Sequence, residues 1–330
     1  MEPNEPVALS FFCELDGQEL ESLFSDPAVI SRLLDLQAGV SLGILDFGDQ
    51  RAGVVRRLNR AGIPVIAWQL LPRDQGYWYN IRNASQAQAR YREFRSWSAA
   101  QELEWAGLGV DIEPDIGEFQ QLLDNHWRLL PMLFKRRYGK KQLQEARRRY
   151  FDLIAEMRGD GFLVESYELP FIVNELRAGS TLLRRILGIT DVPADRRVLM
   201  LYTSFFRPYG QAFLWRYARD ADTVGVGITG GGVDMNGAGH LPPLDWAELA
   251  RDLRLAGRWC RDIHIFSLEG CVRQGHLERL KGFDWEQPAQ PPRHWLVLVY
   301  LLRAGLQTAL WLSARSIPGK RIGTKDSIAR

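Results

Sequence analysis

The sequence predicts a single (β/α)8 barrel, and three observations lead to this fold class. The chain has 330 residues, a length that α/β barrels often reach as one domain. Strand-like stretches alternate with helix-like stretches along it, which is the order of a parallel α/β fold. Acidic residues follow several strand-like stretches, and parallel barrels bring such strand ends together at one mouth. A doubly wound sheet is the main alternative, but no G-x-G-x-x-G follows the first predicted strand.

Local start and stop signals define the individual elements. Ser25 or Asp26 can cap a helix whose first turn holds Pro27, Gly62 suits the end of the next helix, and Ser85 can cap a third. The predicted strands cover 7–15, 41–47, 63–71, 107–113, 161–168, 198–204, 223–229 and 262–269. The predicted helices cover 26–36, 50–61, 85–105, 180–187, 209–219 and 245–259, and a long helical excursion over 116–158 follows the fourth strand.

The fourth predicted strand is the most informative stretch of the chain. Side chains alternate between the two faces of a strand, so its three apolar residues share one face and Gly109, Asp111 and Glu113 share the other. The apolar face suits packing against helices, and the face of glycine and acids suits the inside of a barrel. Pro114 ends the ladder and leaves Glu113 at the C-terminal end, where α/β barrels carry their chemistry.

Acidic residues near strand ends predict an acid–base site. Neighbouring carboxylates push each other's pKa values apart and so produce one acid and one base. Glycoside cleavage requires this arrangement, because one carboxyl protonates the leaving oxygen while a second group stabilises the anomeric centre. Pairing with arginine or capping of a helix is the favoured alternative for Glu14, Asp46 and Glu168. The acids near predicted strand ends are Glu14, Asp46, Asp111, Glu113, Glu165, Glu168 and Glu269.

Two short motifs resemble a known enzyme family. The stretch from Gly109 to Glu113 resembles the end of the D-x-x-D-x-D-x-E strand of chitinase-type glycoside hydrolases (family 18). Leu-Met-Leu-Tyr, ending at Tyr202, is similar to the Met-x-Tyr-Asp of that family's sixth strand. The first two aspartates of the strand motif correspond to Ala106 and Gly109, and Thr203 stands where the aspartate after the tyrosine belongs. A D-x-E after a strand also occurs in other hydrolase barrels.

The resemblance implies a role for three residues. Glu113 would be the general acid. Asp111 would orient the acetamido group of the substrate, which acts as an internal nucleophile, and Tyr202 would help to hold it. Without an acetamido group the second carboxylate must come from the protein, and Glu165 on the next strand and Glu269 on the last strand are the candidates. A distance of about 5 Å between the two carboxyl groups would indicate retaining chemistry, and a distance of about 6.5–9.5 Å would indicate inverting chemistry.

Other residues are candidates for substrate contacts. Trp68, Tyr77 and Trp78 lie at or after the third strand, and their rings could stack on sugar faces. Packing in the core is an equally good interpretation of these rings. Glu14 and Asp46 are further candidates, because they lie at the ends of the first two strands. The expected partner is therefore a carbohydrate substrate.

Two other functions remain open. The glycine-rich stretch that begins Gly230-Gly231-Gly232 follows the seventh strand, where many barrels bind phosphate, and it favours a sugar-phosphate lyase or isomerase. No lysine lies on a predicted strand, which argues against a Schiff-base aldolase. A barrel that only binds carbohydrate is the third possibility. No cofactor or metal site is expected: the histidines show no H-x-x-x-H or H-E-x-x-H spacing, and His264 is expected to pack in the core. A Mg²⁺ or Ca²⁺ ion held by the carboxylates at the mouth is the alternative.

The domain plan divides the chain into three parts: a catalytic barrel over 1–294, an apolar helix over 295–316 that closes the barrel or associates with a membrane, and a basic tail over 317–330. Residues 295–314 are long enough to span a bilayer, but Arg303 and Gln307 form a polar stripe that favours a buried helix.

Partners and location follow from charge and from the N-terminus. The net charge is only +2, and the basic stretch over 135–149 is typical of a solvated helix face, so no nucleic-acid partner is expected. The N-terminus has no apolar core of a signal peptide, which predicts a cytoplasmic protein, with a membrane-associated or exported form as the alternative.

Overall fold

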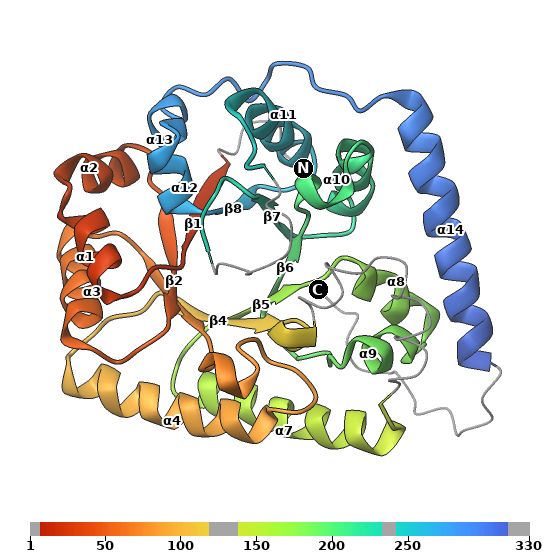
Figure 1. Ribbon diagram of the computed structural model, residues 1–330, viewed down its shortest axis with the longest axis horizontal. Helices are drawn as coiled ribbons and strands as arrows, with labels where there is room; N and C mark the ends of the chain where they lie inside the picture. Colours follow the sequence, from red (N-terminus) through yellow and green to blue (C-terminus); the bar gives the residue numbers. More distant parts are fainter. Residues whose placement is uncertain (1–6, 119–137, 233–241, 316–330) are drawn as a thin grey trace.

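The computed structural model describes residues 7–118, 138–232 and 242–315 of the chain. Within these residues eight parallel strands pair in sequence order, and the first pairs with the last to close a barrel (Figure 1). The predicted (β/α)8 fold class is therefore confirmed. Part of the predicted helical excursion (119–137), most of the glycine-rich stretch (233–241) and the basic tail (317–330) lie outside the described residues.

The strands are short and lie within or next to the predicted ranges. They are β1 Ala8–Cys13, β2 Gly39–Ile44, β3 Val65–Gln69, β4 Gly107–Ile112, β5 Val164–Glu168, β6 Arg196–Met200, β7 Thr223–Gly227 and β8 Asp262–Phe266. The helices are α1 Gly17–Ser25, α2 Pro27–Asp35, α3 Asp49–Ala61, α4 Ala84–Ala100, α7 Lys140–Gly159, α8 Phe171–Ala178, α9 Leu182–Leu187, α10 Gly210–Ala218, α11 Trp246–Gly257, α12 Leu268–Arg273, α13 His276–Arg279 and α14 Arg293–Arg315. Short 3₁₀ turns are η1 Arg73–Gln75 and η3 Thr203–Phe206.

Local caps explain several helix ends. The Asp26 side chain accepts a hydrogen bond from Ala28 N at 2.8 Å at the start of α2, as predicted. Gly62 has φ +75° after α3, a conformation that glycine adopts without steric cost. The long fourth helix begins after Asn83 rather than at Ser85. The sequence prediction missed α1, which begins after the capping residue Asp16.

The alternation predicted for β4 is present in the structure. Its apolar residues Leu108, Val110 and Ile112 belong to a core cluster with residues of α4 and α7, between the barrel and the helices. Gly109 faces inward, where the Tyr167 ring fills the space beside it: a Cβ on Gly109 would lie 2.2 Å from Tyr167 Oη. The barrel interior therefore needs glycine at this level of β4.

The close approach at Gly109 gives a prediction about stability. Gly109→Ala is expected to lower the free energy of unfolding by about 1–3 kcal/mol through overpacking, because Tyr167 Oη is held by a 2.6 Å hydrogen bond to Ser41 and cannot move away freely. Gly53→Ala is the matched control, since Gly53 lies inside α3 with no atom within 4 Å of an added Cβ. The control should gain roughly 0.5–1 kcal/mol. Urea unfolding measures both changes, and an unchanged Gly109→Ala protein would contradict the packing argument.

The helix α14 lies outside the ring of helices, along α8 and α10 (blue, at the right of Figure 1). Its polar stripe faces the barrel: Arg303 pairs with Asp220, and Gln307 Oε1 accepts a 3.0 Å hydrogen bond from Asn174. Only Val299 and Leu310 of this helix are buried.

The expectation of a buried helix that closes the barrel is therefore wrong. The strands close the barrel by themselves, and most apolar residues of α14 point outward. By length and composition alone, α14 is the one helix among the described residues that could cross a membrane.

Candidate active site

A cavity of about 520 Å³ lies at the C-terminal ends of the strands. Three carboxylates line it, Glu14 after β1 and Asp111 and Glu113 at the end of β4. Asp111 is 2% exposed and Glu113 is 9% exposed, so both carboxyl groups are largely withdrawn from solvent. The structure thus brings three of the acids singled out in the sequence into one cavity.

The geometry of β4 explains why Asp111 and Glu113 lie together. They occupy alternate positions, so both side chains leave the strand on its inward face. Pro114 follows and also lines the cavity. β4 pairs with β3 and β5 up to this point, which fixes the backbone that carries both acids. Asp111 therefore lies within a paired strand, and Glu113 directly follows the last paired residue, Ile112.

Burial and mutual repulsion disfavour two charges in this pair. Burial raises the pKa of Asp111 well above its usual range, and the neighbouring charges of Glu113 and Glu14 raise it further. Burial also raises the pKa of Glu113, to about 7. The Asp111 Oδ1 atom is buried without a hydrogen-bond partner among the described residues. The pair consequently retains at least one proton near neutral pH and can act as an acid.

The aromatic residues at the cavity divide into two groups. Trp68, Trp78 and Tyr202 line it, in agreement with their predicted place at the mouth. Burial raises the pKa of Tyr202 well above 10, and the charges of Asp111 and Glu113 add to this, so the hydroxyl remains a hydrogen-bond donor. Tyr77 does not line the cavity; it is 3% exposed, and its hydroxyl donates a hydrogen bond to Glu14. The Tyr77 hydroxyl thus holds the Glu14 carboxylate in place.

The structure corrects the expectation for Glu165. It is the second residue of β5 and lies near the N-terminal floor of the barrel, below Tyr167, whose hydroxyl is 3.5 Å from its Oε2. Arg196 lies 3.3 Å and His264 3.6 Å from its carboxyl oxygens. The rings of Phe12 and Tyr167, with centroids 4.8 Å apart, lie in the barrel interior and line the cavity. Glu165 does not line the cavity and is a structural residue of the floor.

The structure also corrects the prediction for the last strand. The sequence analysis places Glu269 at the end of a strand over 262–269, but β8 ends at Phe266 and Ser267 caps α12. His264 and Phe266 face inward instead, where both rings contact Phe12, and burial lowers the pKa of His264 to about 3. Glu269 is buried in the first turn of α12 outside the cavity lining, and its Oε1 accepts a 3.0 Å hydrogen bond from Gly232 N.

Asp46 is not a cavity residue either. Its Oδ2 accepts hydrogen bonds from Arg51 at 2.8 and 3.2 Å, and its Oδ1 accepts one from Gly48 N. Arg51 is fully buried and also donates to the Gly43 and Leu15 carbonyls, which ties the ends of β1 and β2 to α3. Asp46 therefore compensates a buried guanidinium, the alternative interpretation that the sequence left open. Glu168 likewise pairs with an arginine, Arg197, at 2.9 Å.

The glycine-rich loop after β7 lies next to carboxylates. Gly232 N is bonded to Glu269, and a Cβ on Gly232 would lie 2.8 Å from Glu14 Oε2. A Cβ on Gly231 would lie 2.3 Å from Glu269 Oε1. The surroundings of Gly231 and Gly232 are thus acidic, which disfavours a bound phosphate there, although Arg273 donates a 3.2 Å hydrogen bond to the Gly230 carbonyl.

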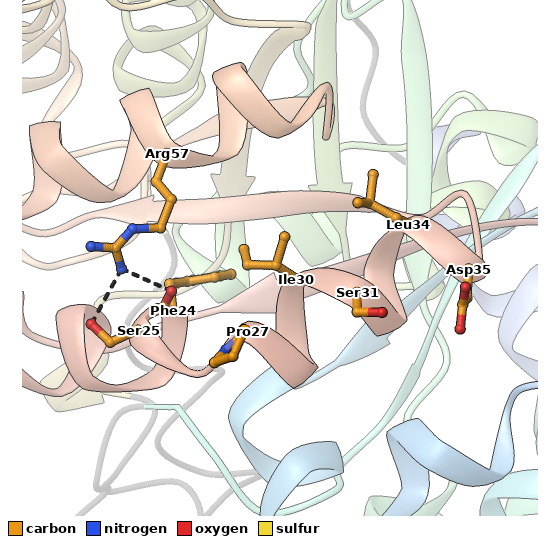
Figure 2. A pocket seen from close by; sticks show the side chains of 8 residues that line it. All are labelled: Phe24, Ser25, Pro27, Ile30, Ser31, Leu34, Asp35 and Arg57. Carbon is orange, nitrogen blue, oxygen red and sulfur yellow. Dashed lines mark hydrogen bonds between the residues drawn. The ribbon is translucent and has the colours of Figure 1, made fainter.

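A second hollow, of about 470 Å³, lies on the outer surface between α1, α2 and α3 (Figure 2). Arg57 crosses one end and donates hydrogen bonds to the Phe24 carbonyl and the Ser25 hydroxyl. Asp35 is the one carboxylate of its lining, so the hollow offers no pair of acids. In the described residues, no group of three or more histidine, cysteine or acidic side chains is placed to hold a metal ion.

The described part of the predicted basic stretch shows ion pairs. Arg147 lies 2.9 Å from Asp191, and Arg149 lies 3.1 Å from Glu145, both at the surface. These pairs fit the solvated helix face that the sequence analysis favoured.

The sequence analysis missed one large part of the cavity lining. Residues that follow β5 and β6, and two from α9, line it with apolar side chains. The sequence analysis predicts a helix over 180–187 and a strand through 204, but it assigns no element to 169–179, where α8 lies, or to 205–208. Two runs of apolar residues could have predicted this lining: Leu169-Pro170-Phe171 directly follows one strand, and Phe205-Phe206 follows another. Apolar residues at the strand ends of a barrel face either a helix or the mouth.

Comparisons with known proteins give structural neighbours alone. No family model and no curated protein matches the chain. A structure of the PgaB (BpsB) glycoside hydrolase domain from Bordetella bronchiseptica is similar at 13% sequence identity and a TM-score of 0.48, over 84% of this chain and 98% of that chain. A GH18 chitinase from Pseudoalteromonas aurantia is similar at 11% identity and a TM-score of 0.43, over 84% of this chain and 99% of that chain. Both are glycoside hydrolases, the class that the strand motif resembles, and the likeness concerns the fold.

Proposed function

We propose that this protein is a glycoside hydrolase in which Glu113 is the general acid. One observation carries the proposal: Asp111 and Glu113 leave the end of β4 on the same inward face and line one cavity, where burial holds the pKa of Glu113 near 7. A carboxyl group that keeps its proton near neutral pH is the group that a glycosidic leaving oxygen needs.

The cleavage can be written from the cavity residues. Glu113 transfers its proton to the glycosidic oxygen as the bond from that oxygen to the anomeric carbon breaks. Water then adds to the anomeric carbon, and its proton returns to Glu113. Asp111 and the Tyr202 hydroxyl would hold the substrate, and Trp68 and Trp78 would contact the sugar through the small part of each ring that is exposed, 3% and 8%.

Two routes can stabilise the anomeric centre. In the first, which the resemblance implies, the acetamido group of the substrate attacks the anomeric carbon and Asp111 orients it. In the second, the carboxylate is Glu14, the remaining acid in the described lining of the cavity. Glu14 is preferred to Glu165 and Glu269 for this role, because neither of those two is part of the described lining of the cavity. The routes differ in substrate, since only sugars with an acetamido group can use the first.

A panel of aryl glycosides tests the proposal. The panel should contain N-acetylated and non-acetylated sugars in both anomeric forms, together with sugar phosphates, and released phenol or rearranged sugar is measured. We expect hydrolysis of at least one aryl glycoside and no conversion of the sugar phosphates. Turnover confined to acetamido sugars would favour the first route. The Asp46→Asn protein is the matched control and should keep the wild-type rate, because Asp46 pairs with Arg51 outside the cavity.

Other outcomes of the same panel would contradict the proposal. Saturable binding of the glycosides without any product would indicate a barrel that only binds carbohydrate. Conversion of a sugar phosphate would support the lyase or isomerase alternative, against the acidic surroundings of Gly231 and Gly232.

A further inference from the structure

In the described lining, six apolar residues form one side of the cavity, next to Tyr202. They come from the segments after β5 and β6 and from α9, and none of their side chains carries nitrogen or oxygen. All of them are partly buried, so apolar surface remains open inside the cavity. This surface is called the apolar side and consists of Leu169, Phe171, Leu183, Leu187, Phe205 and Phe206.

The aromatic part of the apolar side is fixed in place. The Phe206 ring stacks on Phe213 of α10 with centroids 3.9 Å apart. Phe171 meets Phe206 edge to face at 6.2 Å and contacts Phe213 at 5.9 Å. Because these rings support one another from behind, the surface is preformed and does not need a ligand to assemble it.

A sugar ring is a poor occupant of this surface. Its hydroxyl groups would lose water and find no hydrogen-bond partner among the six side chains. An alkyl or prenyl chain, in contrast, gains free energy with each buried methylene. We propose that the substrate is a glycoside whose aglycone is an apolar chain, held by the apolar side while the sugar lies at Asp111 and Glu113. This inference rests on the proposed function and names the substrate class of the same site.

The helix α14 indicates where such a substrate comes from. The helices that contribute Phe171, Leu183 and Leu187 to the cavity carry α14 on their outer side. The outer face of α14 is apolar, with exposed fractions of 42–60% for Val297, Tyr300, Leu301, Leu302, Trp311 and Leu312, and arginines stand at both ends of the helix. An apolar face with cationic ends is typical of a helix that lies on an anionic membrane.

The polar contacts of α14 favour lying on a membrane over spanning one. Arg303 pairs with Asp220 and donates to the Arg216 carbonyl at 2.7 Å, and Ser313 is 2.9 Å from Ser180. Spanning would break these contacts and place Arg303 in hydrocarbon, at considerable cost. The source of the chain-bearing glycoside is thus a lipid surface on which α14 lies.

Chain length is the variable that tests the inference. Hexyl and methyl glycosides of the sugar that the panel selects are compared, and kcat/KM is expected to be at least tenfold higher for the hexyl compound, since one buried methylene contributes about threefold to fourfold. Leu183→Gln should reduce the hexyl-to-methyl ratio about tenfold. Leu163→Gln, at a residue 65% exposed and outside the cavity lining, is the matched control and should keep the wild-type ratio. Equal values for the two compounds in the wild-type protein would overturn the inference.

A binding measurement separates this inference from the proposed function. If no glycoside is hydrolysed, octyl and methyl glucosides are titrated against the wild-type protein while tryptophan fluorescence is followed, because Trp68 and Trp78 line the cavity. Binding that tightens with chain length and is weakened by Leu183→Gln would support the apolar side although hydrolysis had failed. Binding independent of chain length would overturn it.

Vesicles distinguish a membrane from a soluble amphiphile as the source of the apolar aglycone. A dodecyl glycoside of the same sugar is offered in phosphatidylcholine vesicles with and without phosphatidylglycerol. Faster turnover with the anionic lipid, lost in the Leu301→Glu, Leu302→Glu double variant, would support a membrane source. Turnover unaffected by the lipid and by the double variant would overturn the membrane source and leave a soluble amphiphile as the substrate.

Discussion

Replacement of Glu113 by glutamine is expected to lower kcat on the best glycoside by about 10²- to 10⁴-fold, the range that positioned general acids contribute. Glutamine keeps the shape of the side chain but cannot transfer the proton that the leaving oxygen requires. The effect should depend on the leaving group: an alkyl glycoside, whose alkoxide leaves poorly, should lose more than a nitrophenyl glycoside, whose phenolate leaves without much help. Steady-state rates on the two substrates measure the difference.

The same variant should gain stability above neutral pH. Burial raises the pKa of Glu113 from 4.5 to about 7, so at pH 8 the folded protein holds a charge that the cavity disfavours. Glutamine removes that charge, and the Glu113→Gln protein should unfold at a higher temperature than the wild type at pH 8. The Asp46→Asn protein should unfold at a lower temperature than the wild type, because this change removes the partner of the buried Arg51. Equal activity of Glu113→Gln and wild type would remove Glu113 from the mechanism.

The inward pair of acids can be predicted from the sequence because it depends on local rules. Alternation along a strand is a property of five or six consecutive residues, so Asp111 and Glu113 share a face in any fold that makes this stretch a strand. Pro114 marks the end of that strand in the sequence itself. The fold class follows from the order of elements, and the places of Trp68 and Tyr202 at the mouth follow from the fold class.

The other acids could not be placed because their positions depend on distant contacts. Whether Glu165 lies at the floor or at the mouth is decided by where β5 starts to pair with β4 and β6. The role of Asp46 depends on Arg51, a helical residue that turns back to the strand ends. Glu269 lies in a helix and not in the predicted strand, because Ser267 caps α12 at a point where the sequence pattern predicts that the strand continues.

For α14, composition identifies an apolar helix, but it does not say which face is covered. The polar stripe of Arg303 and Gln307 could line a buried core or dock on other helices. In the structure its partners Asp220 and Asn174 belong to the outer layer of the barrel, so the polar side is inward and the apolar side is outward. A polar stripe can therefore be the contact side of a surface helix when the partner surface is polar.

The pH dependence of hydrolysis is expected to have a basic limb near pH 7. The general acid must carry its proton, and the pKa of Glu113 is raised from 4.5 to about 7 by burial. Below pH 6 almost every molecule holds this proton, and above pH 7 kcat/KM should fall about tenfold for each further unit. An ordinary glutamate would already have lost most of its activity at pH 5.5. Rates measured from pH 4 to pH 9 on one aryl glycoside locate the limb.

The position of the limb belongs to the pair of acids rather than to one residue. Because Asp111 and Glu113 interact, the limb is an apparent value of the pair, and it should be absent from the residual activity of Glu113→Gln. Asp46→Asn should leave the limb where it is, since that carboxyl lies outside the cavity. A limb near pH 4.5 in the wild type would mean that the carboxyl groups are solvated in the working enzyme, and that burial does not prepare the acid.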